Sequence, residues 1–115
     1  MHEGPQRLSY TSDVPFLAGM ILSNEPGYYR EGQFGIRLEN LIVVIPAAPL
    51  GDNRDHYAFE TLTFAPFDRR LVLADTLTQG ERDWLNAYHA EVRDKLLPSL
   101  TADAAKWLVS ATASI

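Results

Sequence analysis

The sequence contains no cysteine, which excludes disulfide bonds, thiolate metal sites and a cysteine nucleophile. It also lacks an excess of positive charge, because 10 Lys and Arg stand against 15 Asp and Glu. A chain of net charge −5 is a poor partner for nucleic acid or an anionic membrane, so we expect neither. The longest strongly apolar run, residues 41–50, is far shorter than the ~20 residues of a membrane span. The first residues show no signal-peptide pattern.

The composition changes along the 115 residues, a length that suits one compact domain. Residues 1–67 hold six of the seven prolines and six of the seven glycines, together with β-branched runs. Residues 78–115 carry apolar side chains at helical spacing. Strands followed by helices, without alternation, predict an α+β fold.

Three segments are predicted to be strands. Residues 20–23 end at Pro26-Gly27, residues 36–45 are rich in Ile, Val and Leu, and residues 59–64 mostly alternate apolar and polar side chains. A glycine-containing loop separates the first two segments. We therefore expect 20–25 and 36–45 to be antiparallel neighbours in a hairpin.

Two helices are predicted to follow the strands. Thr78 and Glu81 have the spacing of a capping box, and Pro98 marks the end of the first helix. Thr101 is the expected cap of a second, antiparallel helix. The inner faces are predicted to comprise Trp84, Leu85, Tyr88, Val92, Leu96 and Leu97 in the first helix, and Ala104, Ala105, Leu108 and Val109 in the second.

Glu25 and Glu39 are the two acidic residues with a candidate role. Glu39 lies within an apolar strand, where a carboxylate must be paired, solvated or bound to a cation. If the two strands pair, Glu25 and Glu39 project into one cleft, and a divalent cation between them removes their repulsion. The simpler interpretations remain open: Arg37 and Glu39 form an ion pair on a wet face, and Glu25 merely begins a Pro-Gly turn.

The three histidines differ in their surroundings. His2 stands in a Gly/Pro loop and is a candidate ligand or proton shuttle. His56 borders an acidic loop and is expected at the surface. His89 lies beside the apolar face of the first helix, and we expect a structural role for it.

Several short strings resemble the aminopeptidase P family, the Xaa-Pro aminopeptidases, in order and approximate spacing. They are His2-Glu3-Gly4-Pro5, Gly19-Met20, Asn24-Glu25-Pro26-Gly27-Tyr28-Tyr29 and Gly35-Ile36-Arg37-Leu38-Glu39-Asn40. The strings Phe59-Glu60-Thr61-Leu62-Thr63, Ala65-Pro66-Phe67-Asp68 and Trp84-Leu85-Asn86-Ala87-Tyr88-His89 resemble the C-terminal extension of the longer, cytosolic members. The resemblance implies a pita-bread (creatinase/aminopeptidase-like) fold and a cytoplasmic location.

The resemblance also implies roles for individual residues. Family members hold two divalent metals, typically manganese, with two Asp, one His and two Glu. Glu25 resembles the Glu that binds one metal, and Glu39 the Glu that bridges both. His2 resembles a catalytic His that contacts substrate or moves protons, and Arg37 resembles an Arg that orients the acidic cluster. The implied substrates are peptides with proline in second position, hydrolysed by water that the metals activate.

This chain departs from the family pattern in its ligand set. The two Asp and the ligand His belong upstream of the His2 string, so three of five ligands are expected in a missing N-terminal part of the same protein. Residues 1–58 then correspond to the C-terminal part of the catalytic domain, and residues 59–115 to the extension. Alone, the chain is expected to be inactive, to bind metal weakly or not at all, and to form homo-oligomers. Two alternatives remain: another pita-bread hydrolase such as prolidase, or a non-catalytic binding or scaffolding domain with this fold.

Overall fold

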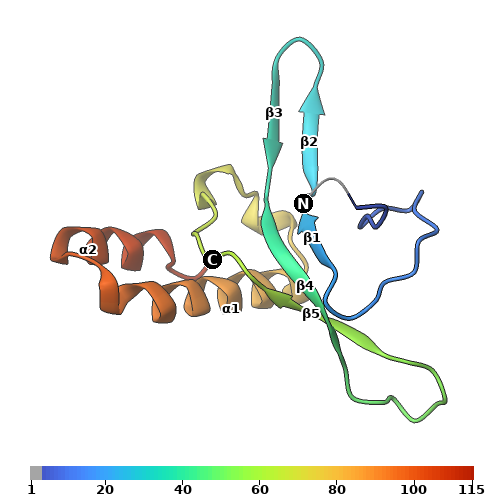
Figure 1. Ribbon diagram of the computed structural model, residues 1–115. Coiled ribbons are helices and arrows are strands. Elements are labelled where there is room, and N and C mark those ends of the chain that lie inside the picture. Colours follow the sequence, from blue (N-terminus) through green and yellow to red (C-terminus); the bar gives the residue numbers. More distant parts are fainter. Residues whose placement is uncertain (1–3) are drawn as a thin grey trace. The chain divides into compact units, whose positions relative to one another are not determined.

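The computed structural model describes residues 4–115, which divide into two compact units at Thr63 and Phe64 (Figure 1). The N-terminal unit contains strands β1 (Ile21–Asn24), β2 (Gly27–Arg30), β3 (Phe34–Arg37), β4 (Asn40–Pro46) and β5 (Tyr57–Thr61). The C-terminal unit contains helices α1 (Gln79–Leu96) and α2 (Ala102–Ala111), with short 3-10 turns at Arg69–Leu71, Ala74–Thr76 and Leu97–Ser99. This order confirms the predicted α+β class.

The strands form two antiparallel sheets, of order β1-β4-β5 and β2-β3. Asn24 is opposite Asn40 in the first sheet, and Gly27 is opposite Arg37 in the second. Both pairings follow one register, so β1 and β2 run opposite β4 and β3 as a single long, interrupted hairpin (Figure 1). The antiparallel pairing predicted for residues 20–25 and 36–45 is thereby confirmed.

The prediction of one continuous strand over residues 36–45 was wrong, because β3 ends at Arg37 and β4 begins at Asn40. The interruption lies opposite Pro26. The Leu38 amide donates to the Pro26 carbonyl at 3.1 Å, but proline has no amide hydrogen to return the bond. The ladder between the two strands therefore lacks one hydrogen bond. Its cause is Pro26 on the opposite strand, so residues 36–45 alone do not predict the break.

The core of the N-terminal unit lies on one face of the three-stranded sheet. Leu22, Ile42 and Val44 are buried there, and Phe16 and Met20 pack against them. Side chains alternate between the two faces of a strand, so Ser23, Leu41 and Val43 belong to the opposite face. Strand β5 begins two residues earlier than predicted and ends at Thr61, after which the Thr63 hydroxyl accepts a hydrogen bond from the Leu41 amide at 2.8 Å.

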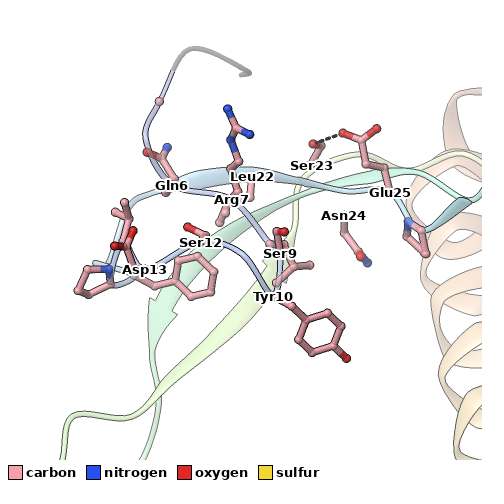
Figure 2. A pocket seen from close by; sticks show the side chains of 16 residues that line it. Gln6, Arg7, Ser9, Tyr10, Ser12, Asp13, Leu22, Ser23, Asn24 and Glu25 are labelled. Carbon is pink, nitrogen blue, oxygen red and sulfur yellow. Dashed lines mark hydrogen bonds between the residues drawn. The ribbon is translucent and has the colours of Figure 1, made fainter.

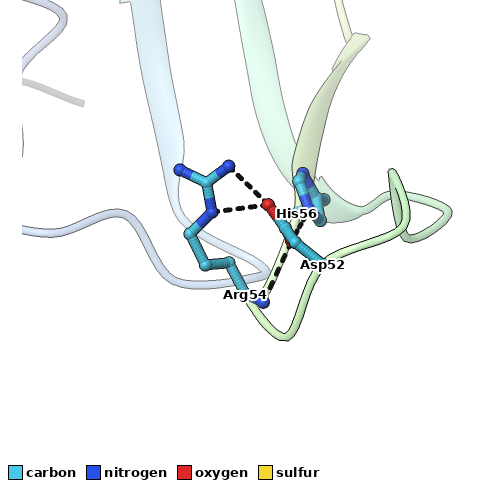
Figure 3. A network of polar contacts seen from close by, with 3 residues as sticks. All are labelled: Asp52, Arg54 and His56. Atoms are coloured by element: carbon cyan, nitrogen blue, oxygen red, sulfur yellow. Dashed lines mark hydrogen bonds and ion pairs between the residues drawn. The ribbon is translucent and has the colours of Figure 1, made fainter.

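A polar network closes the loop between β4 and β5 (Figure 3). Asp52 accepts hydrogen bonds from the Arg54 guanidinium and backbone amide, and its other contact is His56 Nε2 at 2.7 Å. The Arg54 side-chain bond, followed by that of His56, lowers the pKa of Asp52. His56 is thus held against Asp52 and is only partly exposed, where the sequence predicted a surface residue.

Helix α1 begins as its sequence predicts. Thr78 Oγ1 accepts from the Glu81 amide at 3.3 Å, and the Glu81 carboxylate accepts from the Thr78 amide at 2.7 Å, which completes the capping box. The hydrogen bonds from Thr78 lower the pKa of Glu81. Thr101 occupies the N-cap position of α2, as predicted, although it makes no side-chain cap bond.

The C-terminal unit has its own core, centred on Tyr88, Val92 and Leu108. Phe67, Tyr88 and Trp84 form a stack of rings at its edge, with centroids 4.8 Å apart for Phe67 and Tyr88 and 5.6 Å apart for Tyr88 and Trp84. Two residues predicted to face inward are instead half-exposed. Trp84 is 50% exposed although its ring stacks on Tyr88, and Val109 is 49% exposed on the helix that carries buried Leu108.

Three side chains tie the end of the chain back onto α1 and the preceding turn. The Arg69 guanidinium donates to the carbonyls of Ser110 and Ala111, at 2.6 and 3.1 Å. Arg93 donates to the Thr112 carbonyl at 3.1 Å. Asn86 pairs with both main-chain groups of Ile115, accepting from its amide at 3.0 Å. This group of contacts, the C-terminal clamp, makes α2 and residues 112–115 run back along α1.

His89 is the fully buried member of this unit's aromatic group. Its Nε2 accepts a hydrogen bond from the Phe67 amide at 3.0 Å, so the imidazole is held neutral with its proton on Nδ1. Burial, followed by the positive charges of Arg69 and Arg93, lowers the pKa of His89 from its ordinary value of 6.5. The structural role predicted for His89 agrees with these contacts.

We expect the unit that contains His89 to lose stability as the pH falls below 6.5, before its carboxylates titrate. In that window the unfolded chain binds a proton at this histidine and the folded chain does not, so protonation favours unfolding. Thermal unfolding should be compared at pH 7.5 and 5.5 for the wild type and His89→Gln, whose amide can still accept from Phe67. The wild type should lose more stability than the variant. Equal losses in both proteins would contradict the assignment.

Candidate metal centre

The shared register places Glu25 directly opposite Glu39. Asn24 is opposite Asn40, and Gly27 is opposite Arg37. Between these two pairs, Glu25 is opposite Glu39 and Pro26 is opposite Leu38. Since Pro26 and Leu38 occupy a hydrogen-bonded position, Glu25 and Glu39 occupy a non-hydrogen-bonded one, in which side chains approach most closely. Directly opposite residues share a face. Both carboxylates therefore belong to the face of the hairpin away from the Leu22 core.

Arg37 is on the same face, two residues before Glu39. Its Nη1 lies 2.6 Å from Glu25 Oε2, in an ion pair that is partly exposed. One interpretation left open by the sequence paired Arg37 with Glu39 on the same strand, whereas the structure gives Arg37 a partner across the hairpin. The physical reason is the register, which brings Arg37 within reach of Glu25 diagonally across the hairpin.

Tyr29 holds the other side of the Arg37 guanidinium. Arg37 Nε donates to the Tyr29 hydroxyl, and the guanidinium carbon lies 5.7 Å from the ring centroid. This hydrogen bond, and after it the charge of Glu25, raises the pKa of Arg37, which stays cationic. Gly35 makes room for the ring, because a Cβ at that position would lie 2.8 Å from Tyr29 Cδ1. The sequence predicts a glycine-containing loop between the first two strands, and so gives no sign of this contact, whereas the structure places Tyr29 on β2.

Ser23 contacts the second oxygen of Glu25. Its hydroxyl donates to Glu25 Oε1 at 2.6 Å, and Figure 2 shows both side chains on one side of the strand with Asn24 on the other. Ser23 and Glu25 are two residues apart, the spacing that places strand residues on one face. The spacing of Ser23 and Glu25 in the sequence is thus a signal for this contact.

A large open hollow of about 1130 Å³ reaches Glu25 from the N-terminal side of the same unit (Figure 2). Its wall is formed by Gly4, residues 6–10 and 12–16, and residues 22–26. The wall is partly polar, with Gln6, Arg7, Ser12 and Asp13. Glu25 is thus one of the residues that border a space large enough for a peptide-sized group.

The donors fit a divalent metal, but the set is incomplete within the described residues. Two carboxylates opposite each other offer the anionic oxygens that Mn²⁺ and similar cations prefer, and Arg37 balances part of their charge. No group of three or more His, Cys, Asp or Glu able to hold a metal occurs within residues 4–115. His2, the predicted catalytic and substrate-binding residue, lies outside the described residues. The assigned roles of Glu25, Glu39, Arg37 and His2 stay predictions.

Comparison with protein families gives two matches that together span most of the chain. Residues 1–46 match the metallopeptidase family M24, and residues 55–115 match the C-terminal region of peptidase M24. The first match contains both candidate metal ligands. The second contains both helices, the ring stack and the C-terminal clamp.

Individual relatives are longer proteins. Aminopeptidase P1 of Arabidopsis thaliana is 42% identical over 97% of this chain and 18% of its own length. A probable Xaa-Pro aminopeptidase P of Tuber melanosporum is 43% identical over 100% of this chain and 20% of its own. The crystal structure of X-prolyl aminopeptidase from Caenorhabditis elegans, a cytosolic enzyme with a di-nuclear active site, superposes with a TM-score of 0.75 at 32% identity, over 87% of this chain and 17% of that one.

The chain thus spans about a fifth of the length of these relatives. The structural match confirms the expected pita-bread architecture, with antiparallel strands followed by two helices. The two family matches follow each other along the sequence, and they agree with the 42–43% identity to aminopeptidases P over nearly the whole chain. The chain belongs to metallopeptidase family M24 and includes its C-terminal region.

Proposed function

We propose that the whole protein is a dinuclear-metal exopeptidase that removes the N-terminal residue from peptides with proline in second position. One observation carries the proposal: the hairpin register sets Glu25 opposite Glu39, with Arg37 beside them, in a chain of family M24. Relatives named Xaa-Pro aminopeptidase support the substrate class. A non-catalytic scaffold has no physical need for this arrangement of charges.

In this proposal Glu25 and Glu39 supply two of the metal ligands, and further ligands come from residues beyond the described set. A metal pair, when bound, supplies Lewis acidity and an activated water near neutral pH. Glu39 would add a second negative charge beside Glu25 to hold the cations. Arg37 orients Glu25 and offsets the acidic charge, and Tyr29 holds Arg37 in place. His2 is proposed to contact the substrate and move a proton. Manganese is the metal we propose, and the cytoplasm the compartment, as for the cytosolic relative.

No helix in the part of the chain that the structure describes has the length and hydropathy to cross a bilayer.

The proposal is tested with the full-length protein and two peptides that differ only in having proline or alanine in second position. We expect release of the first residue from the proline peptide alone, loss of activity after dialysis against EDTA, and recovery on adding Mn²⁺. Absence of cleavage after metal is restored would favour a non-catalytic protein. Cleavage of dipeptides only would favour a prolidase.

We also propose that the protein forms homo-oligomers through the C-terminal unit. Trp107, on α2, is 61% exposed, and the ring of Trp84 is half-exposed at the edge of the stack. Tryptophan is enriched in protein interfaces relative to the rest of the protein surface.

Light scattering of the full-length protein at micromolar concentration is expected to give at least a dimeric mass. Trp107→Glu should reduce it to a monomer, because it places a charge where an apolar ring is buried between copies. Val109→Glu, on another side of α2 and similarly exposed, is the matched control and should leave the mass unchanged. A monomeric wild type would contradict self-association, and a Trp107→Glu oligomer would point to strand edges instead.

A further inference from the structure

Ser23 is the residue near the candidate metal centre that the proposed chemistry leaves without a role. It lies on β1, half-buried, two residues before Glu25 and on the same face. A carboxylate has no hydrogen to donate, so the 2.6 Å contact between Ser23 Oγ and Glu25 Oε1 is a hydrogen bond from the hydroxyl to the acid.

The two oxygens of Glu25 are held by different donors. The neutral hydroxyl of Ser23 donates to Oε1, and the Arg37 guanidinium lies 2.6 Å from Oε2. Donors at both ends fix the rotation of the carboxylate plane, which a single contact leaves free. Because Ser23 is on β1 and Arg37 is on β3, the orientation of the Glu25 carboxylate is fixed relative to both strands of the hairpin.

A fixed carboxylate matters for a metal ligand more than for a surface ion pair. Each carboxylate oxygen has two lone pairs, so a hydrogen bond from Ser23 or Arg37 does not by itself prevent that oxygen from binding a cation. Groups that orient a ligand commonly change metal affinity 10- to 100-fold when they are removed. A hydroxyl that only satisfied the end of a strand would affect folding and leave metal affinity unchanged.

We propose that Ser23 is a positioning residue for the metal-ligating carboxylate of Glu25, and that its hydroxyl sets the orientation in which Glu25 meets the cation. This inference rests on the proposed function, since it takes Glu25 to be a ligand. Ser23 does not itself touch metal or substrate. Arg37 neutralises part of the charge on Glu25, whereas Ser23 orients the carboxylate without changing the net charge of the site.

The test compares Ser23→Thr with Ser23→Val in the full-length protein. Both side chains are β-branched and suit a strand, and they differ in a hydroxyl against a methyl group. Calorimetric titration of the metal-free proteins with Mn²⁺ should show an affinity within about 3-fold of wild type for the threonine variant, and about 10- to 100-fold weaker for the valine variant. Visible absorption of the Co²⁺-loaded proteins should change for valine only, because the ligand geometry changes.

Two further variants separate the possible failures. Glu25→Gln should lose more affinity than Ser23→Val, and Ser110→Ala, an exposed serine on α2, should bind as the wild type does. If Ser23→Val keeps wild-type affinity while Glu25→Gln loses it, the positioning role is overturned and the metal site stands. If Glu25→Gln also keeps wild-type affinity, the proposed function fails. Equal weakening by Ser23→Thr and Ser23→Val would show that the strand, and not the hydroxyl, is responsible, and would also overturn the proposal.

Discussion

Replacing Glu39 by glutamine in the full-length protein is expected to lower kcat/KM for a peptide with proline in second position by more than about 1,000-fold, or about 4 kcal/mol of transition-state stabilisation. Glutamine keeps the length and shape of the side chain but carries no negative charge. In the proposed centre, the cations would then repel each other with less compensation, and an amide nitrogen would replace one carboxylate oxygen. Mn²⁺ content, measured by elemental analysis after gel filtration, should fall in the same variant.

Glu60→Gln is the matched control for this experiment. Glu60, on β5, lies opposite Val43, so it belongs to the same sheet face as Glu39. Its replacement by glutamine removes the same charge. Glu60 is exposed and has no part in the proposed centre. Its kcat/KM should stay within about 2-fold of wild type, as expected of a surface charge. A similar loss in both variants would mean that general charge, and not a ligand at residue 39, controls the activity.

Leu108→Ala is expected to destabilise the C-terminal unit by about 3 kcal/mol, within the range of 2–5 kcal/mol measured for buried leucines. Leu108 is 1% exposed and contacts the core around Tyr88 and Val92. Its truncation leaves a cavity between α1 and α2 that the aromatic rings cannot fill without leaving their stack. Urea unfolding followed at 222 nm reports this unit, because both α-helices lie within it.

Val109→Ala provides the comparison for Leu108→Ala. Val109 is 49% exposed on the same helix, and alanine has the higher helix propensity, so its change should stay within about 0.5 kcal/mol. A loss of less than 1 kcal/mol for Leu108→Ala would contradict the packing described for this unit. Comparable losses of stability for both variants would show that the two faces of α2 contribute equally to its packing.

Helix α1 could be predicted from the sequence because its signals are local. The Thr78 and Glu81 capping pair and the proline at residue 98 act within one turn of the helix ends that they define. The inner faces were predicted less well. Spacing alone assigned Val109 and Trp84 to the core, while His89, which is fully buried, was placed beside it. Which edge of an apolar face is covered depends on the partner element, and helical spacing contains no information about the partner.

The candidate site was predictable only as far as residue types allowed. Glu25, Glu39 and Arg37 stand out because charges are rare in apolar strands, and the hairpin between them follows from the glycines. The partner of Arg37 and the contribution of Tyr29 depend on the register, which decides which residues of the two strands face each other. The contact of Ser23 with Glu25 depends instead on their spacing of two along the chain. Pro26 shows the same limit, since the strand break that it causes appears on the opposite strand.

The C-terminal clamp has a consequence for how this protein can diverge. Arg69 and Arg93 bind carbonyl oxygens of residues 110–112, and Asn86 pairs with the main chain of Ile115. Every amino acid presents the same carbonyl, so substitutions in this segment leave the bonds intact. Orthologues are therefore free to drift in sequence at exposed Ser110 and Ser114 while Arg69, Asn86 and Arg93 stay fixed, and an alignment should show variable residues held by invariant ones.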